Sequence, residues 1–265
     1  TVSMVPITPN GKLIASVEDQ ARKEGPDGHR MNFRSTLSEE AGYAFLTGVA
    51  AKGDRSLICQ GSQSLAQIYE FLNINPGLHL PIYMLELTRA LSPGTSIKPD
   101  HTTTMRTSDT GEIVLFGRSL QDNYDKALLL LKLMESDGVW IPGRLVVKGF
   151  IETHTFTTQR QNSFEHLAQS EVNEFLGKRT NPYIFSDYEN RALGVLDFDA
   201  RYSEEKFAID QTLLMAGLKF DEVSEKLKLK VLARKIKRLK DKAFKKTMST
   251  INSPLFAGED TKRIP

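Results

Sequence analysis

The residues whose types and spacing most clearly suggest chemistry form a basic segment, 226–246, near the end of the chain. It holds eleven Lys and Arg residues against one acidic residue, Asp241, so its net charge is +10 and that of the remaining chain is −8. On a helix, Leu232, Ile236 and Leu239 would share one face, with most cations on the other. Like charges at this density repel one another unless anionic groups neutralise them. Phosphate groups would do so with release of counterions.

We therefore interpret the chain as a non-enzymatic nucleic-acid-binding protein that contacts the phosphate backbone of DNA or RNA, without a cofactor. Lysine outnumbers the side chains that read base edges bidentately, which predicts binding without sequence specificity. The opposite charges of body and helix would also suit a repeated subunit of a nucleoprotein assembly. The predicted backbone contacts are Arg234, Lys235, Lys237, Arg238, Lys242, Lys245 and Lys246.

A smaller candidate for nucleic-acid contact lies in the stretch HRMNFR, residues 29–34. Phe33 stands between Arg30 and Arg34, and an aromatic side chain beside cations is what binders of single strands use to stack bases. A structural reading stays open, because an aromatic side chain also anchors loops to a core.

Another pattern with chemical content is the stretch LGVLDFD, residues 193–199. On a strand, Asp197 and Asp199 would point to the same side, where two carboxylates can hold Mg²⁺ or Mn²⁺. An apolar strand that ends in Asp-x-Asp resembles the first catalytic motif of archaeo-eukaryotic primases. The resemblance implies metal-dependent nucleotidyl transfer. That family has a histidine downstream of the motif, whereas all five histidines here lie upstream, so this reading is the alternative.

A third interpretation is that the basic segment binds protein. Its apolar spacing also fits a short heptad seam. The chain would then be a structural or oligomer-forming protein, whose helix meets another copy or an acidic partner. Zinc-dependent hydrolysis and nucleotide binding by a Walker-type loop are not indicated. The sequence contains neither a His-Glu-x-x-His motif nor a Gly-rich phosphate loop with Lys-Ser/Thr.

The elements expected to position these residues are hairpins and helices. Asn10-Gly11 suits a tight turn between strands at 3–8 and 12–17, and Asp109-Thr110-Gly111 suits one between 102–107 and 112–117. Residues 19–34 read as a loop. Helices are expected at 38–51, 64–72, 81–91, 121–135, 164–176 and 204–217, and strands at 144–158 and 193–199.

Hairpins mixed with helices, without regular strand–helix alternation, predict an α+β fold that ends in a basic amphipathic helix. We expect an α+β body over 1–220, the basic helix over 221–250 and a tail over 251–265, and a subdivision of the body near 95–100 stays open. Cys59 is the only cysteine, and neither a leader-like start nor a membrane-length apolar run is present. These features predict an intracellular protein in a reducing compartment, with the cytoplasm as the simplest location and no membrane partner.

Overall fold

The computed structural model describes residues 1–6, 10–25, 28, 30–91, 98–136, 139–152, 165–179, 223, 225 and 226. The chain divides into two compact units, Thr1–Phe220 and Asp221–Pro265. Nearly all described residues belong to the first unit. The basic helix expected over 221–250 and the tail over 251–265 therefore stay predictions.

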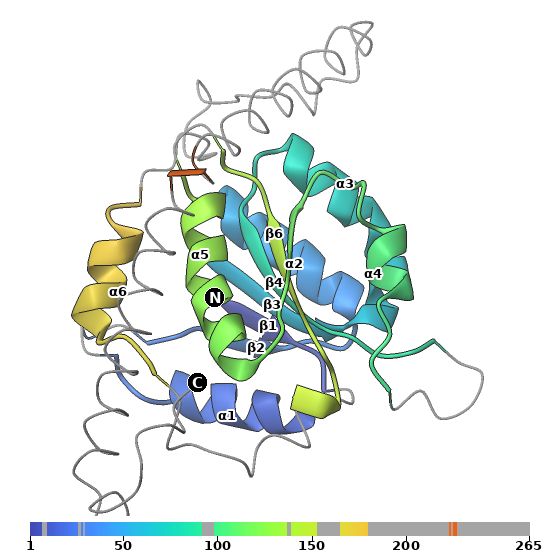
Figure 1. Ribbon diagram of the computed structural model, residues 1–265, viewed down its shortest axis with the longest axis horizontal. Coiled ribbons are helices and arrows are strands. Elements are labelled where there is room, and N and C mark those ends of the chain that lie inside the picture. Colours follow the sequence, from blue (N-terminus) through green and yellow to red (C-terminus); the bar gives the residue numbers. More distant parts are fainter. Residues whose placement is uncertain are drawn as a thin grey trace, which may run out of the picture. The chain divides into compact units, whose positions relative to one another are not determined.

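A six-stranded sheet forms the centre of the first unit, in the order β2-β1-β3-β4-β6-β5 (Figure 1). Every pairing between these described strands is parallel. The strands are β1 (Val2–Met4), β2 (Phe33–Ser35), β3 (Ser56–Gly61), β4 (Ile82–Leu87), β5 (Ile113–Phe116) and β6 (Gly143–Val147).

Helices connect the described strands, and one further helix, α6, follows the last of them. They are α1 (Gly11–Ala21), α2 (Glu39–Ala51), the 3-10 helix η1 (Ser62–Ala66), α3 (Tyr69–Gly77), α4 (Thr102–Arg106), α5 (Leu120–Met134) and α6 (Gln169–Leu176). The fold is thus a Rossmann-like α/β fold. The predicted mixture of helices and strands is confirmed, whereas the α+β arrangement with hairpins gives way to an all-parallel sheet. Parallel strands cannot be joined by tight turns, so each connection needs a crossover segment.

Both predicted hairpins are wrong. After β1 the chain forms helix α1, and Asn10 precedes that helix instead of making a turn. In the second case, the stretch 102–107 forms α4, and β5 pairs in parallel with β6. The loop expected over 19–34 contains the end of α1 and the first residues of β2.

The helix predictions are correct where apolar residues at helical spacing follow a capping residue. Helices α2 and α5 confirm the predictions for 38–51 and 121–135, and each has a serine N-cap whose Oγ accepts a backbone N–H. The helix expected over 81–91 is wrong, because Ile82–Leu87 forms β4 in the middle of the sheet. Five of its six residues are buried, so the strand lacks the alternation of a half-exposed strand.

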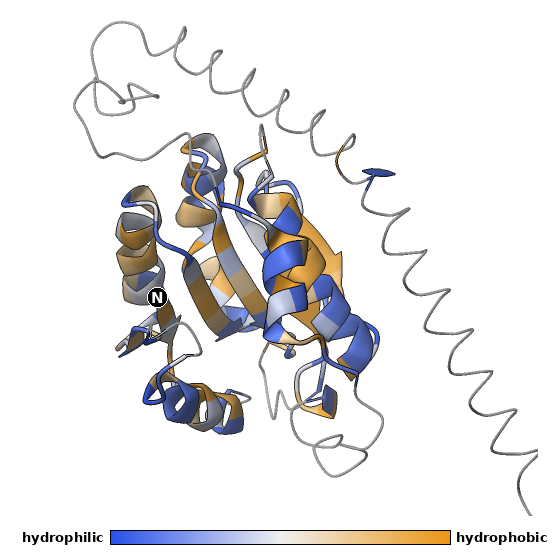
Figure 2. Ribbon diagram, turned by 90° about the vertical axis from the view of Figure 1, so that its left-hand side faces the viewer, coloured by the Kyte–Doolittle hydropathy of each residue, from blue (hydrophilic) through white to orange (hydrophobic). Residues whose placement is uncertain are grey.

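The two faces of the sheet are covered by different helices. Helix α5 packs against β5 and β6, whereas α2 packs against β1, β3 and β4 on the opposite face (Figure 1). Because crossovers between parallel strands are almost always right-handed, the strand order leads us to expect α1 on the same face as α5, and α3 and α4 on the same face as α2. Hydropathy colouring shows strongly apolar strand segments between helices of mixed character (Figure 2). Among the described residues, no helix combines the length and apolar character needed to cross a bilayer.

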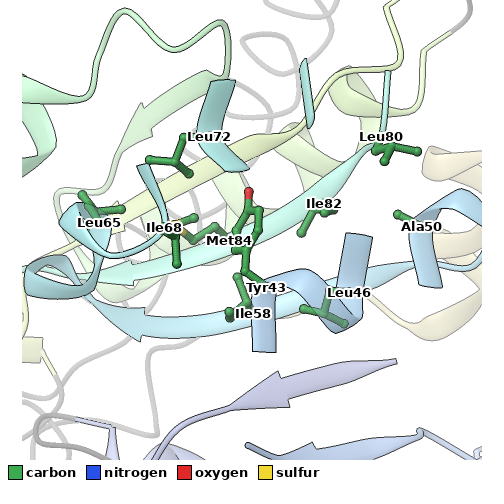
Figure 3. Packing of buried hydrophobic residues seen from close by; sticks show 10 residues of the cluster. All are labelled: Tyr43, Leu46, Ala50, Ile58, Leu65, Ile68, Leu72, Leu80, Ile82 and Met84. Carbon is green, nitrogen blue, oxygen red and sulfur yellow. The ribbon is translucent and has the colours of Figure 1, made fainter. Parts of the chain in front are cut away.

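The principal hydrophobic cluster fills the space beneath α2 and α3 (Figure 3). Tyr43 and Leu46 of α2 lie against Ile58 of β3 and Met84 of β4, and none of the four side chains is measurably exposed. Burying such side chains stabilises the fold by about 1.5 to 3 kcal/mol each. This packing fixes α2, the helix that carries the candidate site, against the sheet.

Candidate functional site

The candidate site lies at the carboxyl edge of the sheet, where β1 and β3 are neighbours. Helix α1 leads from β1 towards β2, while η1 and α3 lead from β3 towards β4 on the other side. The chain therefore leaves two adjacent strands in opposite directions. In open parallel sheets, ligands bind outside the carboxyl ends of the strands at such a switch point.

A buried carboxylate, Glu39, occupies this edge. It is the first residue of α2, and only 7% of it is exposed. Ser64 of η1 donates a hydrogen bond to its Oε1 at 2.6 Å. A buried carboxylate is costly without such a donor, and the partial positive charge of the helix N-terminus favours it further. The Glu39–Ser64 pair therefore joins the start of α2 to the segment that follows β3.

Gly42 allows α2 to lie close to the strands. A Cβ atom at this position would lie 2.7 Å from Oγ of Ser3 and 2.8 Å from Oγ1 of Thr36. Those two hydroxyls are themselves 3.3 Å apart and join β1 to the residue that follows β2. A side chain at Gly42 would push the first turn of α2, and Glu39 with it, away from this edge.

Two acceptor oxygens are buried near this edge, one on the residue that precedes α1 and one near the end of β3. Asn10, just before α1, donates from Nδ2 to the carbonyl oxygen of Cys59 at 3.3 Å. Gln60 of β3 places its Nε2 3.5 Å from Sδ of Met84. Within the described part of the chain, Oδ1 of Asn10 and Oε1 of Gln60 receive no hydrogen bond. Buried acceptors of this kind favour a ligand that can donate hydrogen bonds.

The loop after β4 is tied to the same edge by Ser62, the first residue of η1. Its Oγ accepts a hydrogen bond from the amide of Arg89 at 2.9 Å and donates one to the carbonyl oxygen of Arg89 at 3.0 Å. The backbone of Arg89 is therefore fixed beside the segment that carries Ser64. The site thus combines a carboxylate with buried amide oxygens, and the backbone of Arg89 is held beside them.

A second group of charges is buried on the same face of the sheet, around Arg144 of β6. Its Nη1 lies 3.4 Å from Oε2 of Glu86, and its Nη2 lies 3.4 Å from Oε2 of Glu112. The guanidinium also donates to Oγ1 and the carbonyl oxygen of Thr107 at 2.8 and 2.9 Å. Tyr43 of α2 donates to Oε1 of Glu112 at 3.3 Å. We call Arg144, Glu86 and Glu112 the buried cluster.

The buried cluster contains one cation for two carboxyl groups. Burial raises the pKa of Glu112 to about 7, although Arg144 and the Tyr43 hydroxyl favour its ionised form, and Glu86 raises that pKa further. Burial also raises the pKa of Glu86. Two carboxylates cannot both ionise cheaply beside a single buried cation. The cluster therefore holds a proton at neutral pH.

Replacing Glu112 by glutamine should flatten the pH dependence of stability. The pKa of Glu112 is about 7 in the folded chain against an ordinary value of 4.5, so the folded state binds more protons between these values. Its stabilising contribution is complete below its unfolded pKa and is lost as pH rises through about 7, by about 3 kcal/mol. Glutamine resembles the protonated carboxyl and cannot ionise. Denaturant unfolding between about pH 5 and pH 8 checks this, and equal pH slopes for both proteins would contradict it.

Three of the residues predicted for nucleic-acid contact lie in the described part of the chain, on or beside strand β2. Phe33 and Arg34 belong to β2, the edge strand, where Phe33 is half-buried and Arg34 is exposed. Arg30 is exposed and makes a backbone bridge with Glu24. The other predicted contact residues fall within 234–246, and they lie outside the described residues. The pair Asp197 and Asp199 lies outside them as well.

Glu39 is not among the site residues predicted from the sequence, although a signal for it exists. Glu39 and Glu40 both lie at the start of the helix predicted over 38–51. The apolar periodicity of that helix places Glu39 on the same face as Tyr43 and Leu46, whereas Glu40 lies on the exposed face. A carboxylate on the apolar face of a helix is unusual enough to indicate a functional role.

Comparison with known proteins identifies the family. Residues 1–223 match the family model described as "Pyruvate flavodoxin/ferredoxin oxidoreductase, thiamine diP-bdg". A ketoisovalerate oxidoreductase subunit, VorA, from Pyrococcus abyssi is 30% identical over 209 residues, which are 78% of this chain and 50% of that protein. The pyruvate synthase subunit PorA of Thermotoga maritima is 31% identical over 206 residues, 77% of this chain and 50% of that protein.

A solved structure, 2-oxoglutarate:ferredoxin oxidoreductase from Magnetococcus marinus, is also similar. The TM-score is 0.49 with 18% sequence identity, over 75% of this chain and 42% of that one. The chain spans about half the length of the curated relatives that it matches.

These matches overturn the function expected from the basic segment. The interpretation as a non-enzymatic nucleic-acid-binding or nucleoprotein subunit is wrong, and so is the nucleotidyl-transfer alternative, because the matching proteins are oxidoreductase subunits. The expectation of no cofactor is wrong, since the family model is described as binding thiamine diphosphate. The prediction that DNA or RNA is the partner is also wrong, because the matching proteins are oxidoreductase subunits, which points to other protein subunits as partners. The match over residues 1–223 shows that the chain belongs to the thiamine-diphosphate-binding family of pyruvate flavodoxin/ferredoxin oxidoreductases.

Proposed function

We propose that the chain is a subunit of a 2-oxoacid:ferredoxin oxidoreductase and that the carboxyl edge around Glu39 holds the aminopyrimidine end of thiamine diphosphate. The observation that carries this proposal is the buried Glu39–Ser64 pair at the switch point of the sheet. Bound thiamine diphosphate supplies a nucleophilic carbanion and an electron sink for decarboxylation of a 2-oxoacid. The protein's task is to bind, orient and protonate this group.

The residues at the carboxyl edge fit an aminopyrimidine. Its ring nitrogens accept hydrogen bonds and its amino group donates them. Glu39 would form a hydrogen bond with a ring nitrogen and share a proton with it. The buried oxygens of Asn10 and Gln60 are acceptors of the kind that the amino group needs.

The residues fit the other end of the cofactor and an iron–sulfur cluster less well. Within the described residues, no three His, Cys, Asp or Glu side chains are grouped to hold the metal ion that a diphosphate requires. Cys59 is the only cysteine of the whole chain and is fully buried, whereas an iron–sulfur cluster needs four ligands. The described residues therefore support the aminopyrimidine end of the cofactor at this edge, and the proposal is limited to that end.

Arg89 suits the substrate. A 2-oxoacid carries a carboxylate beside the reacting carbonyl group, and an arginine pairs with a carboxylate bidentately. Arg89 follows β4 at the carboxyl edge, and Ser62 forms hydrogen bonds with both its backbone N–H and its carbonyl oxygen. The small 2-oxoacids of the relatives' names, pyruvate and ketoisovalerate, are therefore the substrates to test.

The proposal is tested on the native complex isolated through a tag on this chain. We expect reduction of ferredoxin, or of a viologen dye in its place, that depends on a 2-oxoacid and is lost when thiamine diphosphate is removed. Returning the cofactor with Mg²⁺ should restore the rate. A complex that contains no thiamine diphosphate and oxidises neither pyruvate nor ketoisovalerate would overturn the proposed function.

A further inference from the structure

We propose that the buried cluster of Arg144, Glu86 and Glu112 positions the Glu39–Ser64 pair, so that the cluster acts on catalysis without touching the cofactor. The inference rests on the function proposed above and concerns the same site. Two series of contacts support the inference. One runs from Arg144 through α2 to Glu39, and the other runs from Arg144 through α4 to Ser64.

The first connection runs through α2 to Glu39. Tyr43 lies one helical turn after Glu39 on the buried face of α2, and its ring has no measurable exposure. Its hydroxyl donates to Glu112, whose other oxygen lies 3.4 Å from Arg144. A fully buried hydroxyl has no water as an alternative partner, so its bonds with Glu112 and Asn75 restrict the rotation of α2 about its axis. That rotation sets the direction in which Glu39 points.

The second connection runs through α4 to Ser64. Arg144 donates twice to Thr107, the residue that ends α4, and lies 3.4 Å from Glu86. Thr104 of α4 donates to the other oxygen of Glu86. Helix α4 in turn packs against η1, the segment that carries Ser64. Arg144 is therefore connected both to α2, which carries Glu39, and to α4, which packs against the segment that carries Ser64.

The charges of the buried cluster should make the position of the Glu39–Ser64 pair depend on pH. The titratable groups that face Glu112 are Arg144 of β6, Glu86 of β4 and Tyr43 of α2. With Glu112 protonated, Arg144 and Glu86 balance one another. When Glu112 ionises, a second buried negative charge has no counter-charge of its own, and the elements around it must shift to relieve it. We therefore expect the site to be best formed below the pKa of Glu112, which is about 7.

The sharpest variant is Tyr43→Phe, which removes one oxygen and keeps the ring in the core. Its matched control is Tyr124→Phe on α5, where the lost hydroxyl accepts the amide of Leu167 at 3.0 Å, away from Arg144. In the native complex, Tyr43→Phe should raise the thiamine diphosphate concentration for half-maximal activity about five- to tenfold. Tyr124→Phe should leave it unchanged. A lower melting temperature for Tyr43→Phe with wild-type cofactor affinity and kcat would overturn the proposal.

The second test follows cofactor affinity against pH. In the wild-type complex, the half-saturating concentration should rise several-fold as pH increases through about 7, and in Glu112→Gln it should stay nearly constant. Titration of the cofactor is common to both proteins and cancels in the comparison. Identical pH profiles would overturn the positioning role. The proposed function fails separately, if the wild-type complex shows no activity that depends on thiamine diphosphate.

Discussion

Replacing Glu39 by glutamine should lower the rate of 2-oxoacid oxidation by the native complex at least about a hundredfold. Glutamine keeps an oxygen that can accept the hydrogen bond from Ser64, so the first turn of α2 should hold its place. It cannot exchange a proton with a ring nitrogen of the cofactor. We therefore expect kcat to fall while the melting temperature changes little. The rate is measured at saturating thiamine diphosphate, with bound cofactor counted in the same sample.

The control for this prediction is the next residue. Glu40→Gln removes the same charge from the same helical turn, but Glu40 is exposed, so it tests any effect of charge at the N-terminus of α2. Glu40→Gln should retain wild-type activity. Equal losses in the two variants, or near wild-type activity in Glu39→Gln, would contradict the role of Glu39.

Replacing Arg144 by methionine should cost about 3 to 5 kcal/mol of folding free energy. Methionine fills a similar volume, so packing is largely retained and the loss is electrostatic. Glu86 and Glu112 would remain buried without a cation, and both would need protons to fold. The loss should therefore be larger near pH 8 than near pH 5. Denaturant unfolding of the chain at both values measures it.

Two comparisons show whether burial causes this effect. Arg22 makes an ion pair of 2.7 Å with Glu18 on the surface, and its side chain is 76% exposed. Arg22→Met should cost less than about 0.5 kcal/mol. Replacing Arg144, Glu86 and Glu112 together by apolar residues of similar volume should restore much of the stability lost in Arg144→Met. A triple variant as unstable as the single one would show that the loss comes from packing.

The parts of the fold that could be predicted from sequence are those whose signals are local. Helix α2 has a serine cap and an apolar face, and α5 has the same two features. Such signals depend on residues within one or two turns. The order and direction of the strands depend on which segments meet across the sheet. Nothing near Asn10-Gly11 distinguishes a hairpin turn from the start of a crossover helix.

The central strand β4 illustrates the limit. Ile82–Leu87 follows a proline that suits a helix start, and its residues are buried on both sides because helices cover both faces of the sheet. A half-exposed strand alternates apolar and polar residues, but a strand buried on both sides has no such alternation. Once β4 is read as a helix, the parallel sheet cannot be recovered from the remaining short strands.

The sequence by itself determined the helices with local caps and the uneven distribution of charge along the chain. It did not determine the function, because the basic segment is conspicuous in composition while Glu39 is one acidic residue among many. Only the tertiary structure decided that Glu39 meets Ser64, 25 positions away, and that Arg144 lies between Glu86 and Glu112. The physical reason is that desolvation gives a charge its chemical importance, and desolvation depends on elements distant in the chain.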